Sequence, residues 1–460
     1  MEGLEASLQK MRTAGAGSAA LETFRDHYER LGRWDVGMLP ESALEPVEDV
    51  LDLAELPLDA PDAEVLDSTV VLKLNGGLGT SMGLTGPKSL LEVKEGLTFL
   101  DIIARQVLAL RDRFAARVPL VLMNSFHTRE ASLAALRRYP GLAGDVPADF
   151  VQNRFPKLRA DDLQPVSWPP DPELEWAPPG HGDIYTALQT SGMLETLLDR
   201  GYRYAFVSNS DNLGAVPEPH ILAWLAREES PFVMEVADRT EADRKGGHIA
   251  RLRDGRLVLR ERAQVPEEDL NAFEDVRRHR FFNTNNLWVD VEALARALDR
   301  RGGVLGLPLI VNRKTVDPAD PASPEVIQLE TAMGAAIEVF EGARVLRVSR
   351  RRFAPVKTTN DLLVVRSDAY VLTDECHVEP APERGDRSPP IVDLDSRYYK
   401  LLRDFEARFP AGAPSLRACE RLTVVGDVVF GRGVVIRGSV TIEHRGKGQL
   451  RIEDRAVLEG

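Results

Sequence analysis

The sequence predicts an α/β protein, in which a Rossmann-like domain with a mixed, mainly parallel sheet precedes a small C-terminal β-helix-like domain. Three observations predict this fold class. Apolar, β-branched runs alternate with segments of helical periodicity through most of the chain. A glycine-rich turn directly follows the first of these runs, Thr69–Leu74. From Val424 onward, short apolar stretches alternate with glycines. At 460 residues, the chain is long enough for two or three domains.

An N-terminal helical lead-in is expected over residues 1–67. Apolar residues between Leu21 and Leu31 recur at helical spacing, which predicts an amphipathic helix. An acidic loop that contains prolines then continues to about Asp67.

The main domain is expected over residues 68–380, where strands and helices alternate as in βαβ units. A hairpin is predicted around Asp254 and Gly255, because apolar runs flank this Asp-Gly turn on both sides. The expected strands are Thr69–Leu74, Val118–Met123, Tyr204–Ser208 and Val345–Val348, and the expected helices are Leu100–Phe114, Thr128–Arg138, His220–Arg227 and Val326–Phe340.

A linker and helix are expected over residues 381–410. Ala381–Pro390 is rich in proline, glycine and charge, and Tyr398–Phe409 has the pattern of an amphipathic helix. Residues 411–460 then form the small β domain. Its apolar residues recur at even-numbered positions, as in strands with one buried face, and glycines interrupt them. This pattern favours a short β-helix, with a hairpin meander as the alternative.

Composition and charge exclude several classes of protein. The net charge of −14 opposes a general role in binding nucleic acid. No apolar run approaches membrane-spanning length, and the N-terminus lacks the apolar core of a signal peptide. Only two cysteines occur, Cys376 and Cys419, without metal-ligand spacing. We therefore expect a cytoplasmic protein with no membrane partner.

The segment from Leu74 to Ser89 is the strongest functional signal. It contains five glycines and ends in Gly-Pro-Lys-Ser, so that backbone amides and the charge of Lys88 could surround a polyphosphate. A dinucleotide fingerprint fails because Met82 replaces its third glycine, and a Walker A loop fails because Pro87 precedes Lys88. A merely flexible turn would not explain the lysine. The segment therefore predicts a phosphate-binding loop of another type.

This loop resembles the nucleotide-binding loop of the eukaryotic-type UTP–glucose-1-phosphate uridylyltransferase family. Seven further segments resemble the same family in the same order along the chain. They are Gln152–Lys157, Pro178–Asp183, Ser208–Gly214, Lys245–Gly247, Phe282–Trp288, Gln328–Ala332 and Pro355–Asp361. Each motif alone is weakly specific, but their joint occurrence over nearly the whole chain is highly specific. The resemblance implies a GT-A-like nucleotidyltransferase core, with residues 68–380 as the catalytic domain.

The resemblance also implies the reaction and its participants. UTP and glucose 1-phosphate would give UDP-glucose and pyrophosphate by direct attack, in a reversible reaction that depends on magnesium. Lys88 and Lys357 would be catalytic, and Asp211, just after the strand Tyr204–Ser208, would bind Mg²⁺. The nucleotide-binding residues would be Leu74, Asn75, Gly76, Gly77, Gly79, Thr80, Lys88, Gln152, Gly180 and Asp211. The residues for the sugar and its phosphate would be His181, Asn209, Gly247, Asn285, Glu330 and Lys357.

Several alternatives remain open at this point. A different sugar 1-phosphate, such as that of galactose or N-acetylglucosamine, would require only a different pocket shape. A non-catalytic sensor of nucleotide sugars could use the same fold, although the retained lysines oppose it. A dehydrogenase is the weakest alternative. The C-terminal β region is shorter than in relatives, where it supports oligomers, so we expect a monomer or a simple homo-oligomer.

Overall fold

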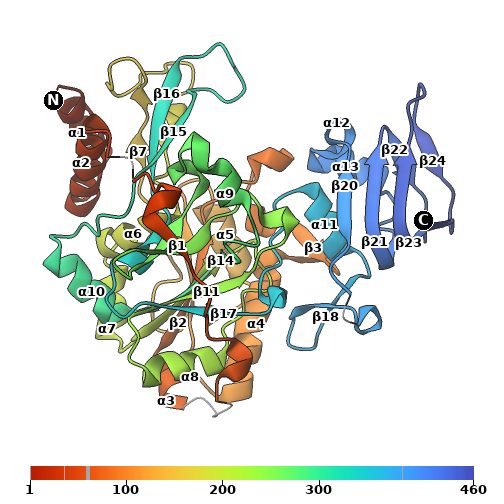
Figure 1. Ribbon diagram of the computed structural model, residues 1–460, viewed down its shortest axis with the longest axis horizontal. Helices are drawn as coiled ribbons and strands as arrows, with labels where there is room; N and C mark the ends of the chain where they lie inside the picture. Colours follow the sequence, from red (N-terminus) through yellow and green to blue (C-terminus); the bar gives the residue numbers. More distant parts are fainter. Residues whose placement is uncertain (1, 36, 58–62, 386) are drawn as a thin grey trace.

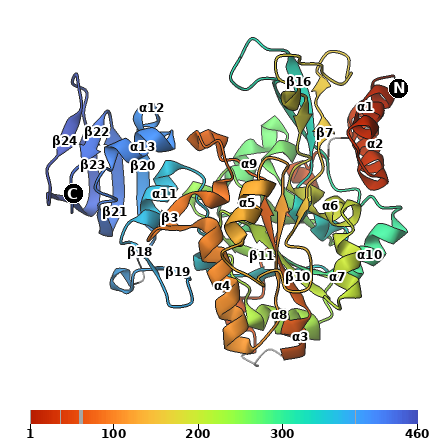
Figure 2. The same ribbon diagram turned by 180° about the vertical axis from the view of Figure 1, so that it is seen from behind.

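The computed structural model describes residues 2–35, 37–57, 63–385 and 387–460. Parts of the expected acidic loop (58–62) and of the expected linker (386) lie outside the described residues. An N-terminal helical pair and a set of C-terminal strands lie at opposite ends of a central α/β body (Figures 1 and 2). None of the described helices combines the length and apolar character that a membrane crossing needs.

A ten-stranded sheet forms the centre of the molecule, with the core order β1-β12-β14-β10-β2-β5-β6. Its strands are β1 (Leu44–Pro46), β2 (Thr69–Asn75), β5 (Leu120–Asn124), β6 (Asp149–Val151), β10 (Tyr204–Asn209), β11 (Phe232–Asp238), β12 (His248–Leu252), β13 (Leu257–Arg260), β14 (Phe281–Asp290) and β17 (Arg344–Arg347). Following the pairings, only β1, β13 and β14 oppose the direction of β2, so seven of the ten strands run the same way. The mixed, mainly parallel sheet is thus confirmed, as is the inserted hairpin β12–β13.

Helices cover both faces of this sheet because alternate strand residues point to opposite sides. On one face, Val70 and Leu72 share an apolar cluster with α6 (Ile184–Thr190), α7 (Met193–Asp199) and α10 (Val291–Arg300). On the other face, Val71 packs with α4 (Phe99–Phe114) and α8 (Pro219–Arg227). A further helix, α5 (Arg129–Leu136), connects β5 to β6. The four predicted strands of this region and three of its four predicted helices are present, with shifts of one or two residues at their ends.

The N-terminal lead-in is a pair of helices, α1 (Glu2–Thr13) and α2 (Ser18–Gly32). Their apolar faces pack on a small outlying sheet of β15 (Ile310–Thr315), β16 (Glu325–Glu330) and β8 (Leu158–Arg159). The ring of Phe24 meets that of Phe155 edge-on at 5.2 Å. The lead-in is therefore attached to the main domain through its own apolar cluster.

Replacement of His27 in α2 by phenylalanine is expected to weaken the pH dependence of stability. Burial lowers the pKa of His27 from 6.5 to about 3. The unfolded chain therefore binds a proton that the folded protein does not, and stability falls as the pH drops from 6.5 towards 3. Between pH 7 and pH 5, His27→Phe should lose about 2 kcal/mol less free energy of unfolding than the unchanged protein. Urea denaturation at both pH values measures this difference, and identical losses would contradict it.

The prediction of a helix at Val326–Phe340 is wrong. The chain forms strand β16 and then a 3-10 helix at Met333–Glu338. The apolar residues do recur at helical spacing, but Val326 and Ile327 favour a strand and pair with Arg159 and Leu158 of β8. Tertiary pairing therefore overrode the local pattern.

The expected helix at Tyr398–Phe409 is broken into α12 (Ser396–Tyr399) and α13 (Leu402–Arg408). The carbonyl of Tyr399 accepts a hydrogen bond from the Thr359 hydroxyl at 2.7 Å, which competes with its use within a continuous helix. Leu401, at the break, lies against Gly83 of the glycine-rich loop. The break therefore brings the C-terminal region into contact with that loop.

The C-terminal strands pair only in parallel within the described residues. One sheet has the order β20 (Ile391–Leu394), β21 (Ser415–Val425), β23 (Val435–Glu443) and β25 (Val457–Glu459), and a second joins β22 (Val428–Phe430) to β24 (Leu450–Ile452). Partners such as Val428 and Leu450 lie 22 positions apart, as do Val435 and Val457. A hairpin meander is excluded, because hairpins pair antiparallel.

Candidate active site

The site candidates gather at the carboxyl ends of two adjacent parallel strands, β2 and β10. The register places Asn209 beside Leu74, so the glycine-rich loop and the Asp211 loop leave the sheet together. The amide of Ser210 donates to the carbonyl of Leu74 at 3.2 Å, which joins the two loops. This edge is where open α/β sheets bind their ligands.

Lys88 and Asp211 meet across these two loops. Lys88 Nζ lies 2.6 Å from Asp211 Oδ2, and both side chains are largely buried. The amide of Lys88 donates to the carbonyl of Gly77 at 3.0 Å, which closes the loop upon itself. The loop therefore holds its lysine inward, beside the carboxylate that was predicted to bind the metal.

Gln152 lies directly against the glycine-rich loop. A Cβ atom on Gly76 would be 2.7 Å from Gln152 Oε1, so only glycine permits this approach. Leu74 is half-buried at the end of β2, whereas Gly77 and Thr80 are exposed. Asn75 offers a ligand only its backbone, because its side chain is buried and donates to Asn124 Oδ1 at 2.7 Å and Ser132 Oγ at 2.8 Å.

His181 is held as a neutral hydrogen-bond donor. The amide of Met333 donates to His181 Nδ1 at 3.0 Å, which leaves the ring proton on Nε2. Burial, together with the nearby charge of Lys357, lowers the pKa of His181 to about 4. The preceding Gly180 has φ +79°, and a Cβ there would lie 2.5 Å from the carbonyl oxygen of Thr331 and 3.0 Å from the Cβ of Glu330. Glu330 therefore stands beside this turn, at the end of β16 and not on a helix surface.

Asn285 occupies a bulge in the middle of the central sheet. Met234 pairs with Leu287 and Val236 with Asn283, so that one residue of β11 faces three of β14. Asn285 has φ +59° there, and its amide and side chain form reciprocal hydrogen bonds of 2.8 Å with the Asn283 side chain. Asn285 therefore belongs to a hydrogen-bonded β-bulge inside the sheet, and not to a polar strand edge.

The segment of Lys357 is joined to the Asp211 loop, and the charge of Lys357 acts on side chains from distant parts of the sequence. Lys357 is exposed, and the amide of the preceding Val356 donates to the carbonyl of Asp211 at 3.1 Å. Its charge also acts on Glu261: burial raises the pKa of that carboxyl, and Lys357 opposes the rise. Glu261 in turn lies against Gly247, where a Cβ would be 2.6 Å from the carboxylate. The charge of Lys357 therefore acts on both His181 and Glu261, and Glu261 borders Gly247.

The sequence model of the UTP–glucose-1-phosphate uridylyltransferase family matches residues 21–437. The chain belongs to this family. Its enzymes from Solanum tuberosum and Hordeum vulgare are 43% and 44% identical to it, over 90% and 87% of this chain and 84% and 82% of theirs. A mutant UDP-glucose pyrophosphorylase from Leishmania major, solved in complex with UDP-glucose, superposes with a TM-score of 0.94 at 47% identity, covering 100% of this chain and 98% of that one. A UDP-glucose phosphorylase from Trypanosoma brucei superposes with a TM-score of 0.92 at 44% identity, covering both chains fully.

The carboxylate of Asp211 suits the magnesium ion expected for a uridylyltransferase. Its Oδ1 atom is buried and has no hydrogen-bond partner in the described structure, while Oδ2 faces Lys88. No group of three or more His, Cys, Asp and Glu side chains in the described ranges could enclose a metal. A single carboxylate oxygen fits Mg²⁺, which commonly takes one or two carboxylates and completes its shell with water and substrate phosphates.

Three charged residues beside the candidate site were not predicted from the sequence. Glu261 immediately follows strand β13, but nothing local distinguishes it from a surface acid. Lys73 and Glu235 were detectable in principle, because each is a charged residue inside an apolar strand run. Lys73 is buried and donates to Ser208 Oγ and to the carbonyl of Ala215, both at 2.7 Å, and burial lowers its pKa to about 7.

Proposed function

We infer that this chain joins UTP to glucose 1-phosphate and releases pyrophosphate, as its family name states. The observation that carries this inference is the Lys88–Asp211 ion pair beside the glycine-rich loop, where the segment that carries Lys357 is joined to the Asp211 loop through the Val356 amide. Membership of the family and the similarity to an enzyme solved with UDP-glucose support it. The geometry supports a polyphosphate held by loop amides and two lysines at the carboxyl ends of β2 and β10.

The chemistry requires positioning and charge neutralisation. An oxygen of the sugar phosphate forms a bond to the α-phosphorus of UTP, the bond from that phosphorus to the bridging oxygen breaks, and pyrophosphate leaves with the electron pair. Lys88 would neutralise the leaving phosphates, and Lys357 the α-phosphate and the sugar phosphate. No general base is needed, because the attacking phosphate is already ionised at neutral pH. The Nε2–H of neutral His181 would donate to the sugar phosphate. The same atoms permit the reverse reaction.

Magnesium is proposed as the cofactor, held by Asp211. When bound, it would supply charge neutralisation to the triphosphate oxygens. Lys88, now paired with Asp211, would turn towards the same phosphates, which offer it a richer set of acceptors.

Glucose is the proposed sugar. Asn209, Gly247, Asn285 and Glu330 are the predicted hydroxyl-binding residues, and the carboxylate of Glu261 beside Gly247 joins them. Buried polar groups discriminate sugars because a wrong epimer leaves one of them unpaired. Galactose and N-acetylglucosamine 1-phosphates are the alternatives.

The C-terminal strands are proposed to form a short β-helix-like domain, supported by their parallel pairing at a spacing of 22 residues. We also propose a cytoplasmic monomer or simple homo-oligomer. The two free cysteines, Cys376 and Cys419, suit a reducing compartment.

Pyrophosphate release from UTP tests the function, with Mg²⁺ and each of the glucose, galactose and N-acetylglucosamine 1-phosphates. Glucose-dependent release that stops on chelation is expected. Preference for another sugar would change the substrate and keep the mechanism. Binding of UDP-glucose without release from any sugar would overturn the inference and favour a sensor.

Replacement of Gln152 by alanine is expected to relax the choice of base. The amide of Gln152 offers one acceptor and two donors beside the loop, which suits the uracil edge. The ratio of kcat/KM for UTP over CTP should fall about 10- to 100-fold, the effect of losing one buried hydrogen-bonding group. Steady-state kinetics with both nucleotides measures the ratio. An unchanged ratio would exclude Gln152 from base recognition.

A further inference from the structure

Two of the charged groups of the proposed mechanism, Asp211 and Lys357, lie on segments that are far apart in the sequence. Asp211 follows β10, and Lys357 precedes helix α11 (Thr359–Arg366). Uridylyl transfer requires both groups to face the same phosphates, so the two segments must keep a fixed separation. The two segments are connected in part through their backbones, because Asn212 and Pro355 form an isolated antiparallel bridge.

The side chain of Asn212 provides the rest of the connection. Its Nδ2 donates to the carbonyl of Arg352 at 3.1 Å, and its Oδ1 accepts from the amide of Ala354 at 2.9 Å. The same Oδ1 accepts from the amide of Gly214 at 3.2 Å, within the loop of Asp211. Asn212 is 1% exposed. One buried amide group therefore bridges the Asp211 loop and the segment that leads to Lys357.

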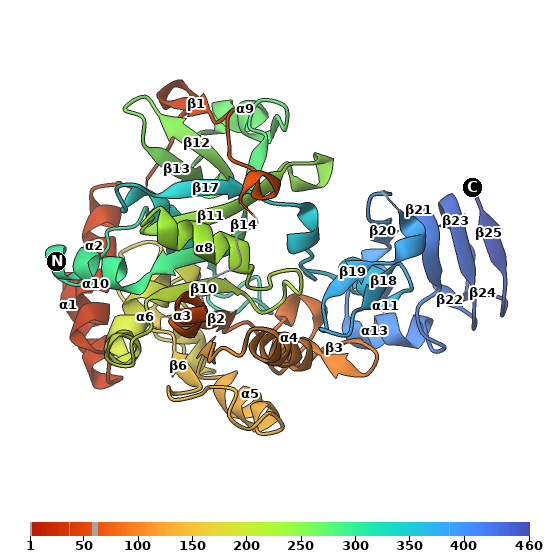
Figure 3. The ribbon, with the colours of Figure 1, turned by 90° about the horizontal axis from the view of Figure 1, so that it is seen from below.

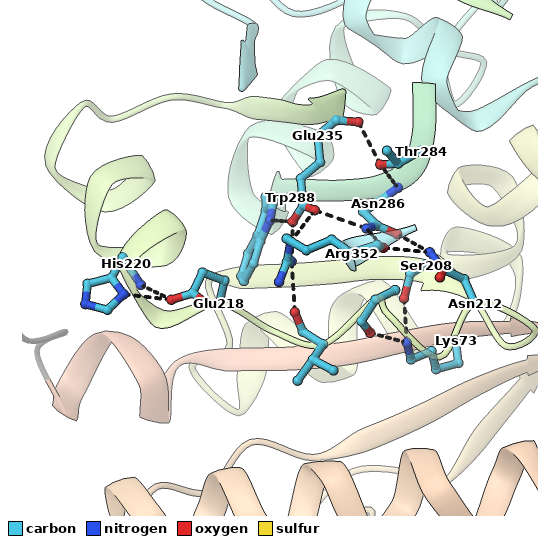
Figure 4. A network of polar contacts seen from close by, with 12 residues as sticks. Lys73, Ser208, Asn212, Glu218, His220, Glu235, Thr284, Asn286, Trp288 and Arg352 are labelled. Atoms are coloured by element: carbon cyan, nitrogen blue, oxygen red, sulfur yellow. Dashed lines mark hydrogen bonds and ion pairs between the residues drawn. The ribbon is translucent and has the colours of Figure 1, made fainter. Parts of the chain in front are cut away.

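A buried ion pair holds this bridge in place (Figure 4). Arg352 Nε and Nη2 donate to the two carboxylate oxygens of Glu235 at 2.8 and 2.6 Å. Glu235 is 0% exposed and also accepts from Asn286 Nδ2 at 3.0 Å and Trp288 Nε1 at 2.9 Å. The carboxylate therefore accepts four hydrogen bonds, and both of its oxygens are satisfied.

Arg352 and Asn286 connect the ion pair to Asn212. The Nη2 of Arg352 donates to the carbonyl of Val216 at 2.9 Å, which reaches the end of the Asp211 loop. Asn286 Nδ2 donates to the carbonyl of Arg352, and Asn212 Nδ2 donates to Asn286 Oδ1, both at 3.2 Å. A buried ion pair contributes little net stability compared with an apolar replacement. Its role here is to hold the Arg352 segment in one conformation relative to β11 and β14.

We propose that Asn212, held by the Glu235–Arg352 ion pair, is a positioning residue that fixes the carboxylate of Asp211 relative to the ammonium of Lys357. The inference rests on the proposed roles of those two residues. Asn212 itself touches neither of their charged groups; it acts through the two backbone segments that carry them.

A double-variant comparison tests this proposal. Asn212→Ala should lower kcat about 100-fold, the effect of a misplacement of roughly 1 Å, with little change in either KM. In a background of Lys357→Ala, the same substitution should have almost no further effect, because the group that it positions is gone. Pyrophosphate release measures kcat, and binding of UDP-glucose shows that the site is formed.

The controls separate positioning from folding. Tyr202→Phe removes a partly buried hydrogen bond of 2.6 Å to Asp145 at the opposite end of β10, and should lower stability without lowering kcat. Asn212→Ser keeps a hydroxyl acceptor for the Gly214 and Ala354 amides. It should lose less kcat than Asn212→Ala, and serves if the alanine variant fails to fold.

Two outcomes would overturn the proposal and are distinguishable. Fully additive losses of kcat in the double variant would show that Asn212 does not act through Lys357. Normal turnover in Lys357→Ala alone would overturn the proposed role of that lysine, and this inference with it.

Discussion

Replacement of Lys357 by alanine is expected to lower kcat about 1000-fold, the scale of removing a cation from a phosphoryl-transfer site. In the proposed mechanism, this ammonium meets the charge that develops on the α-phosphate and the sugar phosphate. Its influence on His181 and Glu261 places it in the same region as both side chains. Because the side chain is exposed, its removal should leave the fold intact.

Two measurements and two comparison variants make this prediction specific. Pyrophosphate release gives kcat, and thermal denaturation should match that of the unchanged protein. Lys357→Arg keeps the charge but not its compact shape, and should restore only part of the activity. The exposed Lys447 in the C-terminal region is a matched control, and Lys447→Ala should turn over normally. Normal turnover by Lys357→Ala would exclude the lysine from the reaction.

Replacement of Asp211 by asparagine is expected to lower kcat about 100- to 1000-fold and to raise the magnesium concentration required for half-maximal activity. The substitution keeps the size of the side chain but removes the charge that would hold the metal. It also removes the ion pair with Lys88, so Lys88 loses its partner at 2.6 Å. Both effects act on the triphosphate side of the proposed reaction.

Titration of activity with Mg²⁺ separates these two effects. If Asp211 binds the metal, high Mg²⁺ should recover part of the lost rate; if the carboxylate only orients Lys88, added metal should recover nothing. Asp145→Asn is a matched control, because its carboxylate bonds to Tyr202 away from the site. An unchanged dependence on Mg²⁺ in Asp211→Asn would contradict the metal assignment.

The family and most of the sheet were predictable because their signals are local. The glycine-rich loop follows a strand in the sequence, and the family motifs around Gln152, Asp211 and Lys357 are short. The comparisons confirm the family. The strands at Thr69–Leu74 and Tyr204–Ser208 were predicted because apolar, β-branched runs are distinctive over a few residues. The predicted helix at Val326–Phe340 was wrong because its strand partner, Leu158–Arg159, lies elsewhere in the chain.

The sequence by itself determined the fold class, the family and the residue types available for binding a nucleotide. Only the tertiary structure decided which of these residues meet. Asn212 and Ala354 are 142 positions apart, and Arg352 and Glu235 are 117 apart. No local pattern encodes such contacts, because they arise when β10, β11 and β14 pair and carry their side chains together. The same pairing buries Glu235 and creates the bulge that carries Asn285, and it therefore sets the geometry that the proposed chemistry requires.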